Sequence, residues 1–220
     1  MILRPLLAGL ATLLLAAGVH ASETVTVAST PGATSDAIEA LIPEARAQGL
    51  EVKLIEFTDW TLPNEAVNNG DVDLNFFQHQ AFLDNAIKER GYHLRMVGLG
   101  LLQNIGIYSN RIKRLEDVPE GARVSLANDP VNQGRGLLLL QKAGLITLRG
   151  GKAEQASQAL LYSGIDDTFY AMGFVARTDR ADAPKIARFV SLFQSSPKVR
   201  AVIAARFGND PKLYTLPWRK

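Results

Sequence analysis

The sequence predicts an α/β protein whose mostly parallel sheet is covered by helices on both faces and arranged in two lobes. Segments with strand patterns alternate with amphipathic helical segments, which is typical of parallel sheets. Unusual side chains gather where predicted strands end, which indicates a ligand site at the carboxyl edge of the sheet. The 220 residues, 47% of them hydrophobic, suffice for one large domain or two small lobes.

The first half is expected to contain four strands and three helices. Residues 24–29 are four β-branched residues followed by two small ones, and a Pro31-Gly32 turn separates them from the first helix. Gly70-Asp71 provides a second turn, directly before a strand. The expected strands are Thr24–Ser29, Glu51–Phe57, Val72–Phe76 and His93–Gly98, and the expected helices are Ser35–Gln48, Pro63–Asn69 and Gln80–Arg90.

The second half opens with the apolar passage Leu99–Leu102 and continues with three further strands and four helices. The run of leucines at 137–140 lies inside the first of these helices. The expected strands are Gln103–Ser109, Arg123–Ala127 and Thr168–Ala176, and the expected helices are Gly134–Ala143, Ala153–Leu161, Ala183–Gln194 and Pro197–Phe207.

The first 21 residues have the pattern of a secretory signal peptide. Arg4 precedes an apolar stretch over residues 6–17, and Val19-His20-Ala21 places small residues at the two positions that a signal peptidase reads. The stretch is shorter than the roughly 20 apolar residues that a spanning helix needs. We therefore expect cleavage near Ala21, a periplasmic location and no stable membrane anchor.

Composition excludes several classes of function. The chain has 24 basic and 22 acidic residues, and its charged runs mix both signs, so no basic face for nucleic acid is expected. It contains no cysteine, which excludes disulfides, thiolate metal sites, thiol nucleophiles and a lipid-modified cysteine.

A polar loop connects the predicted strand 123–127 with the helix that begins at Gly134. It reads Asn128-Asp129-Pro130-Val131-Asn132-Gln133-Gly134-Arg135. Arg135 can hold a carboxylate with two parallel N–H bonds, while Asn132 and Asp129 can accept from an ammonium group, so the loop suits a zwitterion. The simpler interpretation is a helix cap whose arginine pairs with a nearby acid. The loop alone leaves both open.

Two other strand ends carry aromatic and imidazole side chains. Alternation along the strand places Phe76 in the core and Phe77 on the opposite face, where it either lines a cleft or packs under a helix. Trp60 is either a cleft wall or a core or rim residue. His79 directly precedes a helix, where it could cap that helix, bind a ligand, act as a base or bind a metal. A cleft walled by Trp60 and Phe77 opposite Arg135 would suit an amino acid with an apolar tail.

Support for catalysis is weak. The chain lacks Gly-x-Ser-x-Gly, a Walker phosphate loop and a complete Gly-x-Gly-x-x-Gly, of which Gly98-Leu99-Gly100 is a fragment. His79 has no second histidine at metal-binding spacing, so no metal or cofactor is expected. Asp71 and Asp73 share a strand face, and a hydrolase or metal enzyme that uses one of them with His79 is the least favoured hypothesis.

Several of these segments, in this order, resemble the NlpA family of methionine-binding lipoproteins that serve ABC importers. The resemblance covers nearly all of residues 24–148 and resumes at 170–207. Its motifs are Ser29-Thr30-Pro31-Gly32, Glu56-Phe57-Thr58-Asp59-Trp60 with Pro63-Asn64, Gly70-Asp71-Val72-Asp73-Leu74-Asn75-Phe76-Phe77-Gln78-His79, Gly106-Ile107-Tyr108-Ser109, the loop 128–135, and Leu137–Leu140 with Gln141-Lys142-Ala143-Gly144-Leu145-Ile146.

The resemblance implies a two-lobed, type II periplasmic-binding-protein fold that closes on a free amino acid, chiefly methionine, and delivers it to an ABC importer permease. It further implies that Phe77 and the aromatic at Trp60 flank the thioether, that His79 lines the pocket and that Arg135 holds the carboxylate. At Trp60 the family more often has tyrosine.

The second lobe departs from the family pattern. The resemblance divides the chain into a signal peptide at 1–21, a first lobe at 22–99 completed by 178–220, and a second lobe at 100–177 that is incomplete between about 150 and 168. A family asparagine falls at Met172, which cannot bind an ammonium group comparably. The alternative to a methionine-binding protein is therefore a degenerate, non-binding envelope paralogue.

Overall fold

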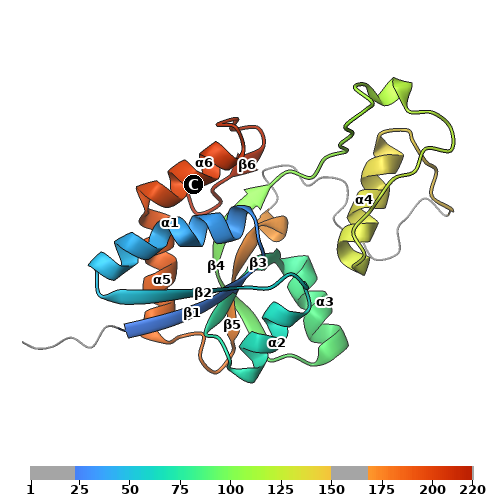
Figure 1. The fold of residues 1–220 in the computed structure, drawn as a ribbon. Coiled ribbons are helices and arrows are strands. Elements are labelled where there is room, and N and C mark those ends of the chain that lie inside the picture. The colour runs from blue at the N-terminus through green and yellow to red at the C-terminus, as the bar shows by residue number, and fades with distance from the viewer. Residues whose placement is uncertain (1–22, 150–167, 220) are drawn as a thin grey trace, which may run out of the picture.

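The computed structural model describes residues 23–149 and 168–219, which form one six-stranded sheet with helices on both faces (Figure 1). The strand order is β2-β1-β3-β5-β4-β6. The strands are β1 (Glu23–Ser29), β2 (Leu50–Glu56), β3 (Leu74–His79), β4 (Leu94–Gln103), β5 (Met172–Arg177) and β6 (Tyr214–Thr215). The helices are α1 (Ala33–Ala47), α2 (Leu62–Asn69), α3 (Gln80–Arg90), α4 (Pro130–Lys142), α5 (Pro184–Ser195) and α6 (Pro197–Arg206), with 3-10 turns η1 (Leu115–Asp117) and η3 (Thr168–Tyr170).

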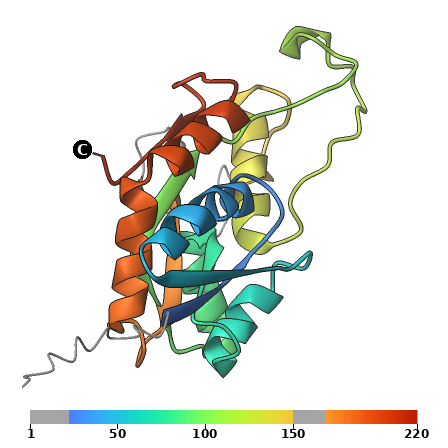
Figure 2. The same ribbon diagram turned by 60° about the vertical axis from the view of Figure 1, so that its left-hand side comes forward.

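The α/β fold class and the helices on both faces are confirmed. On one face α1, α5 and α6 bury Ile38, Phe189 and Ile203 against the sheet, and on the other α2 and α3 bury Val67 and Leu83 (Figure 2). Phe76 is fully buried, as its place in the strand pattern predicted. The predicted signal peptide and the helix predicted at 153–161 lie outside the described residues.

The sheet is mixed, so the prediction of a mostly parallel sheet is wrong. β1 pairs in parallel with β2 and β3, whereas β5 runs antiparallel to both β3 and β4, and β6 antiparallel to β4. We expected the strand at 168–176 in the second lobe, yet β5 lies between β3 and β4 in the same sheet as β1. Its residues Gly173–Ala176 are all buried, which is typical of a central strand.

Close packing explains the glycines of β4. A Cβ at Gly100 would lie 2.4 Å from the ring of Phe76, and one at Gly98 would lie 2.6 Å from Cγ1 of Val190. These glycines therefore let the sheet approach the large core side chains. The Gly98-Leu99-Gly100 segment is a packing feature of a strand, not part of a nucleotide-binding loop.

The strands predicted at 103–109 and 123–127 are not formed. β4 ends at Gln103, and the described residues 104–149 contain η1 and α4 but no strand. A strand needs a neighbouring strand to hydrogen-bond with, and it is stabilised when its apolar side chains are buried. In this region apolar side chains are exposed instead: Tyr108 is 84% and Val124 50% exposed.

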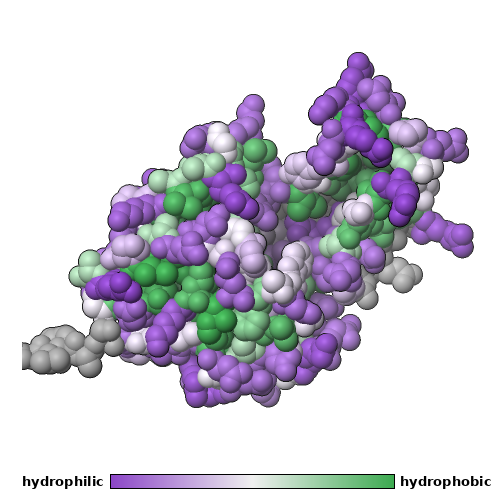
Figure 3. Space-filling view, viewed as in Figure 1, coloured by the Kyte–Doolittle hydropathy of each residue, from purple (hydrophilic) through white to green (hydrophobic). Residues whose placement is uncertain are grey.

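The surface is hollowed between the sheet body and the region that carries α4 (Figure 3).

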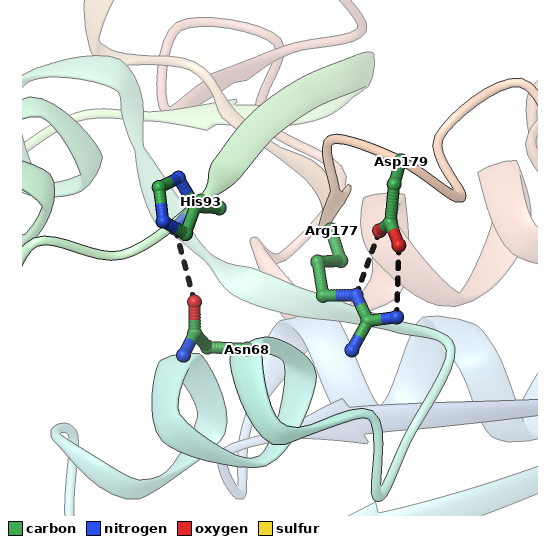
Figure 4. A network of polar contacts seen from close by, with 4 residues as sticks. All are labelled: Asn68, His93, Arg177 and Asp179. Carbon is green, nitrogen blue, oxygen red and sulfur yellow. Dashed lines mark hydrogen bonds and ion pairs between the residues drawn. The ribbon is translucent and has the colours of Figure 1, made fainter.

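Polar contacts lie at the C-terminal end of β5, near the end of α2 and the start of β4 (Figure 4). Asn68 in α2 accepts a hydrogen bond from the backbone N–H of His93 at 3.0 Å. Arg177 donates to both carboxylate oxygens of Asp179, at 2.7 and 2.9 Å.

Over the described ranges, none of the helices is both long and apolar enough to cross a bilayer.

Candidate functional site

Two helix N-termini meet at the candidate site, and each is capped by a side chain that the sequence singled out. β3 ends at His79, whose Nδ1 accepts the N–H of Phe82 at 3.2 Å and so caps α3. Asp129 caps α4 by accepting the N–H of Asn132 at 2.8 Å. His79 and Asp129 are therefore helix caps, and α4 begins at Pro130, so that most of the predicted polar loop forms its first turns.

Asn132 joins the two capped helices. Its Oδ1 lies 2.9 Å from His79 Nε2 and 2.9 Å from Arg135 Nη1, while its Nδ2 donates to the Asp129 carboxylate at 3.1 and 3.2 Å. Both atoms of the amide are thus engaged and its orientation is fixed. Asn132 thus aligns the neighbouring imidazole and guanidinium through one oxygen.

The tautomer of His79 follows from these contacts. Because Nδ1 accepts the Phe82 N–H, the proton of the neutral ring must lie on Nε2, which then donates to Asn132. Arg135 Nη1 lies 3.1 Å from the same Nε2. Since both nitrogens carry hydrogens, this is a contact between two donors that share the Asn132 oxygen as acceptor, not a hydrogen bond.

His79 is held neutral. Burial, followed by the positive charge of Arg135, lowers the pKa of His79 to about 4, against smaller opposing effects of the Asn132 hydrogen bond and Asp129. At neutral pH the site therefore contains a neutral imidazole, whose N–H is donated to Asn132, beside a charged guanidinium. The guanidinium can bind an anionic group such as a carboxylate.

Tyr170, which the sequence analysis missed, completes this cluster. Arg135 Cζ lies 4.1 Å from the centroid of the Tyr170 ring, and the His79 ring meets the same ring edge-on at 5.2 Å. Tyr170 belongs to η3 and is only 5% exposed. The Phe169-Tyr170 pair before a strand was the available signal, but nothing in the sequence connected it with Arg135.

The two predicted aromatic residues lie beside the cluster. Phe77 is 9% exposed and its ring packs edge-on against Phe82 at 5.7 Å, so it is buried near α3. Trp60 is 48% exposed and lines a cavity of about 890 Å³ together with Phe82, Asn128 and Asp129. The structure thus brings His79, Asn132 and Arg135 into contact, and Phe77 is connected to His79 through the ring of Phe82. Trp60 shares its cavity with Phe82 and Asp129, but the described lining of that cavity does not include His79, Asn132 or Arg135.

A β-bulge in β3 positions Asn75 and Gln78 beneath the site. The pairing of β3 with β5 shifts register between Phe76 and Gln78, which leaves Phe77 as the extra residue. The shift lets Asn75 and Gln78 both contact Asn64 of α2, at 2.9 Å and, between Gln78 Nε2 and Asn64 Oδ1, at 2.5 Å. These three amides are at most 2% exposed, and they tie β3 to α2 beneath the site.

The structure also places Met172, where the family has an asparagine, and Asp73, a weak candidate for catalysis. Met172 is the residue of β5 opposite His79, so the position of the family asparagine adjoins the site although β5 is not in a second lobe. Asp73 forms an ion pair with Lys185 at 2.7 Å and accepts a hydrogen bond from the backbone N–H of Thr26 at 2.9 Å. Asp73 therefore has a structural role. No group of three potential metal ligands occurs among the described residues.

Comparison with known proteins supports the resemblance. The model of the NlpA lipoprotein family matches residues 25–160. The D-methionine-binding lipoprotein MetQ of Yersinia pestis is 52% identical over 103 residues, which are 47% of this chain and only 38% of the relative. The chain therefore matches less than half of that relative's length.

Solved structures agree. A periplasmic substrate-binding protein of an ABC transporter from Coxiella burnetii superposes with a TM-score of 0.70 at 29% identity, over 84% of this chain and 97% of that one. A nutrient-binding protein from Burkholderia cenocepacia, solved with bound methionine, gives the same TM-score, identity and coverage. The fold is that of periplasmic substrate-binding proteins, and the chain belongs to the NlpA lipoprotein family.

Proposed function

We propose that this chain is a substrate-binding protein of the cell envelope that binds free methionine, or a similar amino acid, for an ABC importer. The carrying observation is the cluster in which Asn132 fixes both the N–H of His79 and the guanidinium of Arg135. The name of the Yersinia relative and the methionine in the Burkholderia structure support the choice of ligand.

Each site residue has a proposed role. Arg135 forms two parallel bonds to the ligand carboxylate, His79 lines the pocket beside it, and Asn132 keeps both side chains aligned. Phe77 and Trp60 flank the thioether, where a sulfur beside an aromatic ring contributes about 0.3 to 1.5 kcal/mol. The cavity at Trp60 would admit the apolar tail.

Calorimetry tests the proposal. Refolded, ligand-stripped full-length protein is titrated with L-methionine and, separately, with D-methionine. We expect saturable heat with one ligand per chain and a preference for one stereoisomer, and we expect the heat to vanish in Arg135→Ala. Absence of heat from the wild-type protein at millimolar ligand would rule the proposal out.

Met172 favours a second candidate, a degenerate envelope paralogue that has kept the scaffold and lost the ligand. Met172 pairs with His79 in the sheet, at a position where the family pattern has an asparagine, and its side chain packs against the hydrophobic core. Each lost charged hydrogen bond costs on the order of 1.5 to 3 kcal/mol, or one to two decades of affinity. Met172→Asn distinguishes the candidates. If the wild-type protein binds methionine weakly, the variant should bind it more tightly; if the site is lost, the variant should give no heat with methionine either.

The importer and the envelope location are proposed together. They rest on the Coxiella structure's description as a periplasmic component of an ABC transporter. Fractionation of cells that express the full-length gene, followed by detection in osmotic-shock fluid and in membranes, tests the location and distinguishes a released protein from an anchored one. Copurification with permeases encoded beside the gene tests the partner, and a cytoplasmic protein would contradict both.

A further inference from the structure

The Tyr170 ring contacts two polar side chains of the site, Arg135 and His79. Its face lies under the Arg135 guanidinium, with Cζ 4.1 Å from the ring centroid. The His79 ring meets it at 5.2 Å with an interplanar angle of 68°. A single side chain therefore contacts both the guanidinium that would bind a carboxylate and the imidazole beside it.

The Tyr170 ring is itself held in place. It belongs to a small buried cluster with Leu102 and Ala171, against which Ala81 packs. The turn that carries it is closed by a hydrogen bond from the Ala171 N–H to the Thr168 carbonyl at 3.1 Å. Because the ring is buried and its backbone is fixed, it provides a rigid surface beside the site.

Arg135 is restrained in two directions by this arrangement. Asn132 Oδ1 accepts from its Nη1, which restrains the guanidinium in its own plane. The Tyr170 face attracts the cation and restrains it perpendicular to the ring. A long arginine side chain that is already ordered loses less conformational entropy when a ligand binds.

We propose that Tyr170 is a positioning residue that presents Arg135 to the ligand carboxylate. This inference rests on the proposed function, because it assigns to Tyr170 a part in the same site. The necessary feature is the aromatic face and not the phenol hydroxyl. Tyr170→Phe should therefore keep the effect, and Tyr170→Leu, which fills similar space without a π face, should remove it.

The experiment compares methionine with methioninol, which lacks the carboxylate. In calorimetry we expect Tyr170→Leu to weaken methionine binding about tenfold while methioninol binding changes little, so that the ratio of the two affinities falls. Tyr170→Phe should recover most of the loss. The control is Tyr214→Leu, which removes a tyrosine that stacks on Phe207 away from the site. An unchanged ratio in folded Tyr170→Leu would overturn the inference.

A measurement without ligand separates this inference from the proposed function. The Tyr170 ring should shift the NMR signal of the Arg135 Nε–H upfield, in the wild type and in Tyr170→Phe but not in Tyr170→Leu. If the wild type binds no methionine, the proposed function fails, while the shift still reports whether Tyr170 orders Arg135. If the signal is the same in all three proteins, Tyr170 does not position Arg135.

Discussion

At the scale of single residues, His79 combines two tasks that depend on one protonation state. Its Nδ1 caps α3 and its Nε2–H binds Asn132. A proton added to Nδ1 would remove the cap and place a second positive charge beside Arg135. The same geometry that prepares the site for an anion therefore makes the folded protein resist protonation of this histidine.

The pH dependence of stability follows from this resistance. The folded-state pKa of His79, about 4, lies below the ordinary histidine pKa of 6.5. The unfolded chain thus binds the proton first, and the contribution is complete above pH 6.5 and is lost as the pH falls toward 4. We expect His79 to account for a loss of about 2 to 3 kcal/mol between pH 7 and 4.5.

Urea denaturation of wild type and His79→Asn at these two pH values measures this loss. Asparagine can still cap α3 but does not titrate. The free energy of unfolding should fall less in the variant than in the wild type. Equal falls would show that His79 does not titrate between the folded and unfolded states as described.

Sequence reasoning identified part of the site at this scale. His79, Asn132 and Arg135 were recognisable because strand ends and helix starts concentrate polar side chains at one edge of a sheet. The sharing of the Asn132 oxygen could not be foreseen, since it depends on how α4 is placed against β3. Tyr170 was missed for the same reason: no local pattern connects a ring at 170 with a guanidinium at 135.

At the scale of elements, the buried amides of Asn64, Asn75 and Gln78 hold β3 against α2. Asn64 Nδ2 donates to Gln78 Oε1 at 2.9 Å, and Asn64 Oδ1 accepts from both partners. Loss of one member would leave buried polar atoms of the others without partners, which costs about 1 to 3 kcal/mol for each such group.

Asn64→Ala should therefore lower the free energy of unfolding by about 2 to 4 kcal/mol. Asn68→Ala is the matched control in the same helix, because Asn68 is only partly buried and makes one hydrogen bond, to the His93 N–H. The control should cost about 0.5 to 1.5 kcal/mol. Chemical denaturation compares the two, and equal costs would contradict a cooperative buried network.

Gly100 offers a second test at this scale. A methyl group there would meet the Phe76 ring at 2.4 Å, so Gly100→Ala should destabilise the fold by about 1 to 3 kcal/mol. Phe76→Leu in the same chain should relieve part of the clash, and the double variant should be more stable than the two single costs predict. Additive costs in thermal unfolding would show that Phe76 is not the obstacle.

Local patterns predicted most elements but not all pairings. β1, β2, β3 and the helices α1, α2 and α3 were found near their observed bounds because glycines with positive φ, at positions 32, 49, 70 and 91, mark where they end. The strands expected at 103–109 and 123–127 failed because strand character needs a neighbour as well as a sequence. The bulge at Phe77 also escaped prediction, since only the pairing with β5 reveals it.

At the scale of the whole molecule, ligand binding should appear as added stability. A ligand at about 100 times its dissociation constant adds about 2.7 kcal/mol, which raises the melting temperature of a chain of this size by roughly 5 to 10 °C. We expect this rise with methionine in the wild type and not in Arg135→Ala. Arg206→Ala, which removes an exposed ion pair with Asp36, is the matched control and should keep the rise.

The position of β5 has a consequence for biogenesis. β3 and β4 are made early, yet each takes its partner from residues 172–177, so neither can complete its pairing until that late segment arrives. During synthesis the backbone N–H and C=O groups along these strand edges stay unpaired, which makes the chain prone to aggregation. Such a chain cannot finish folding from its N-terminus onward, because the strand that joins β3 to β4 is among the last segments to be made.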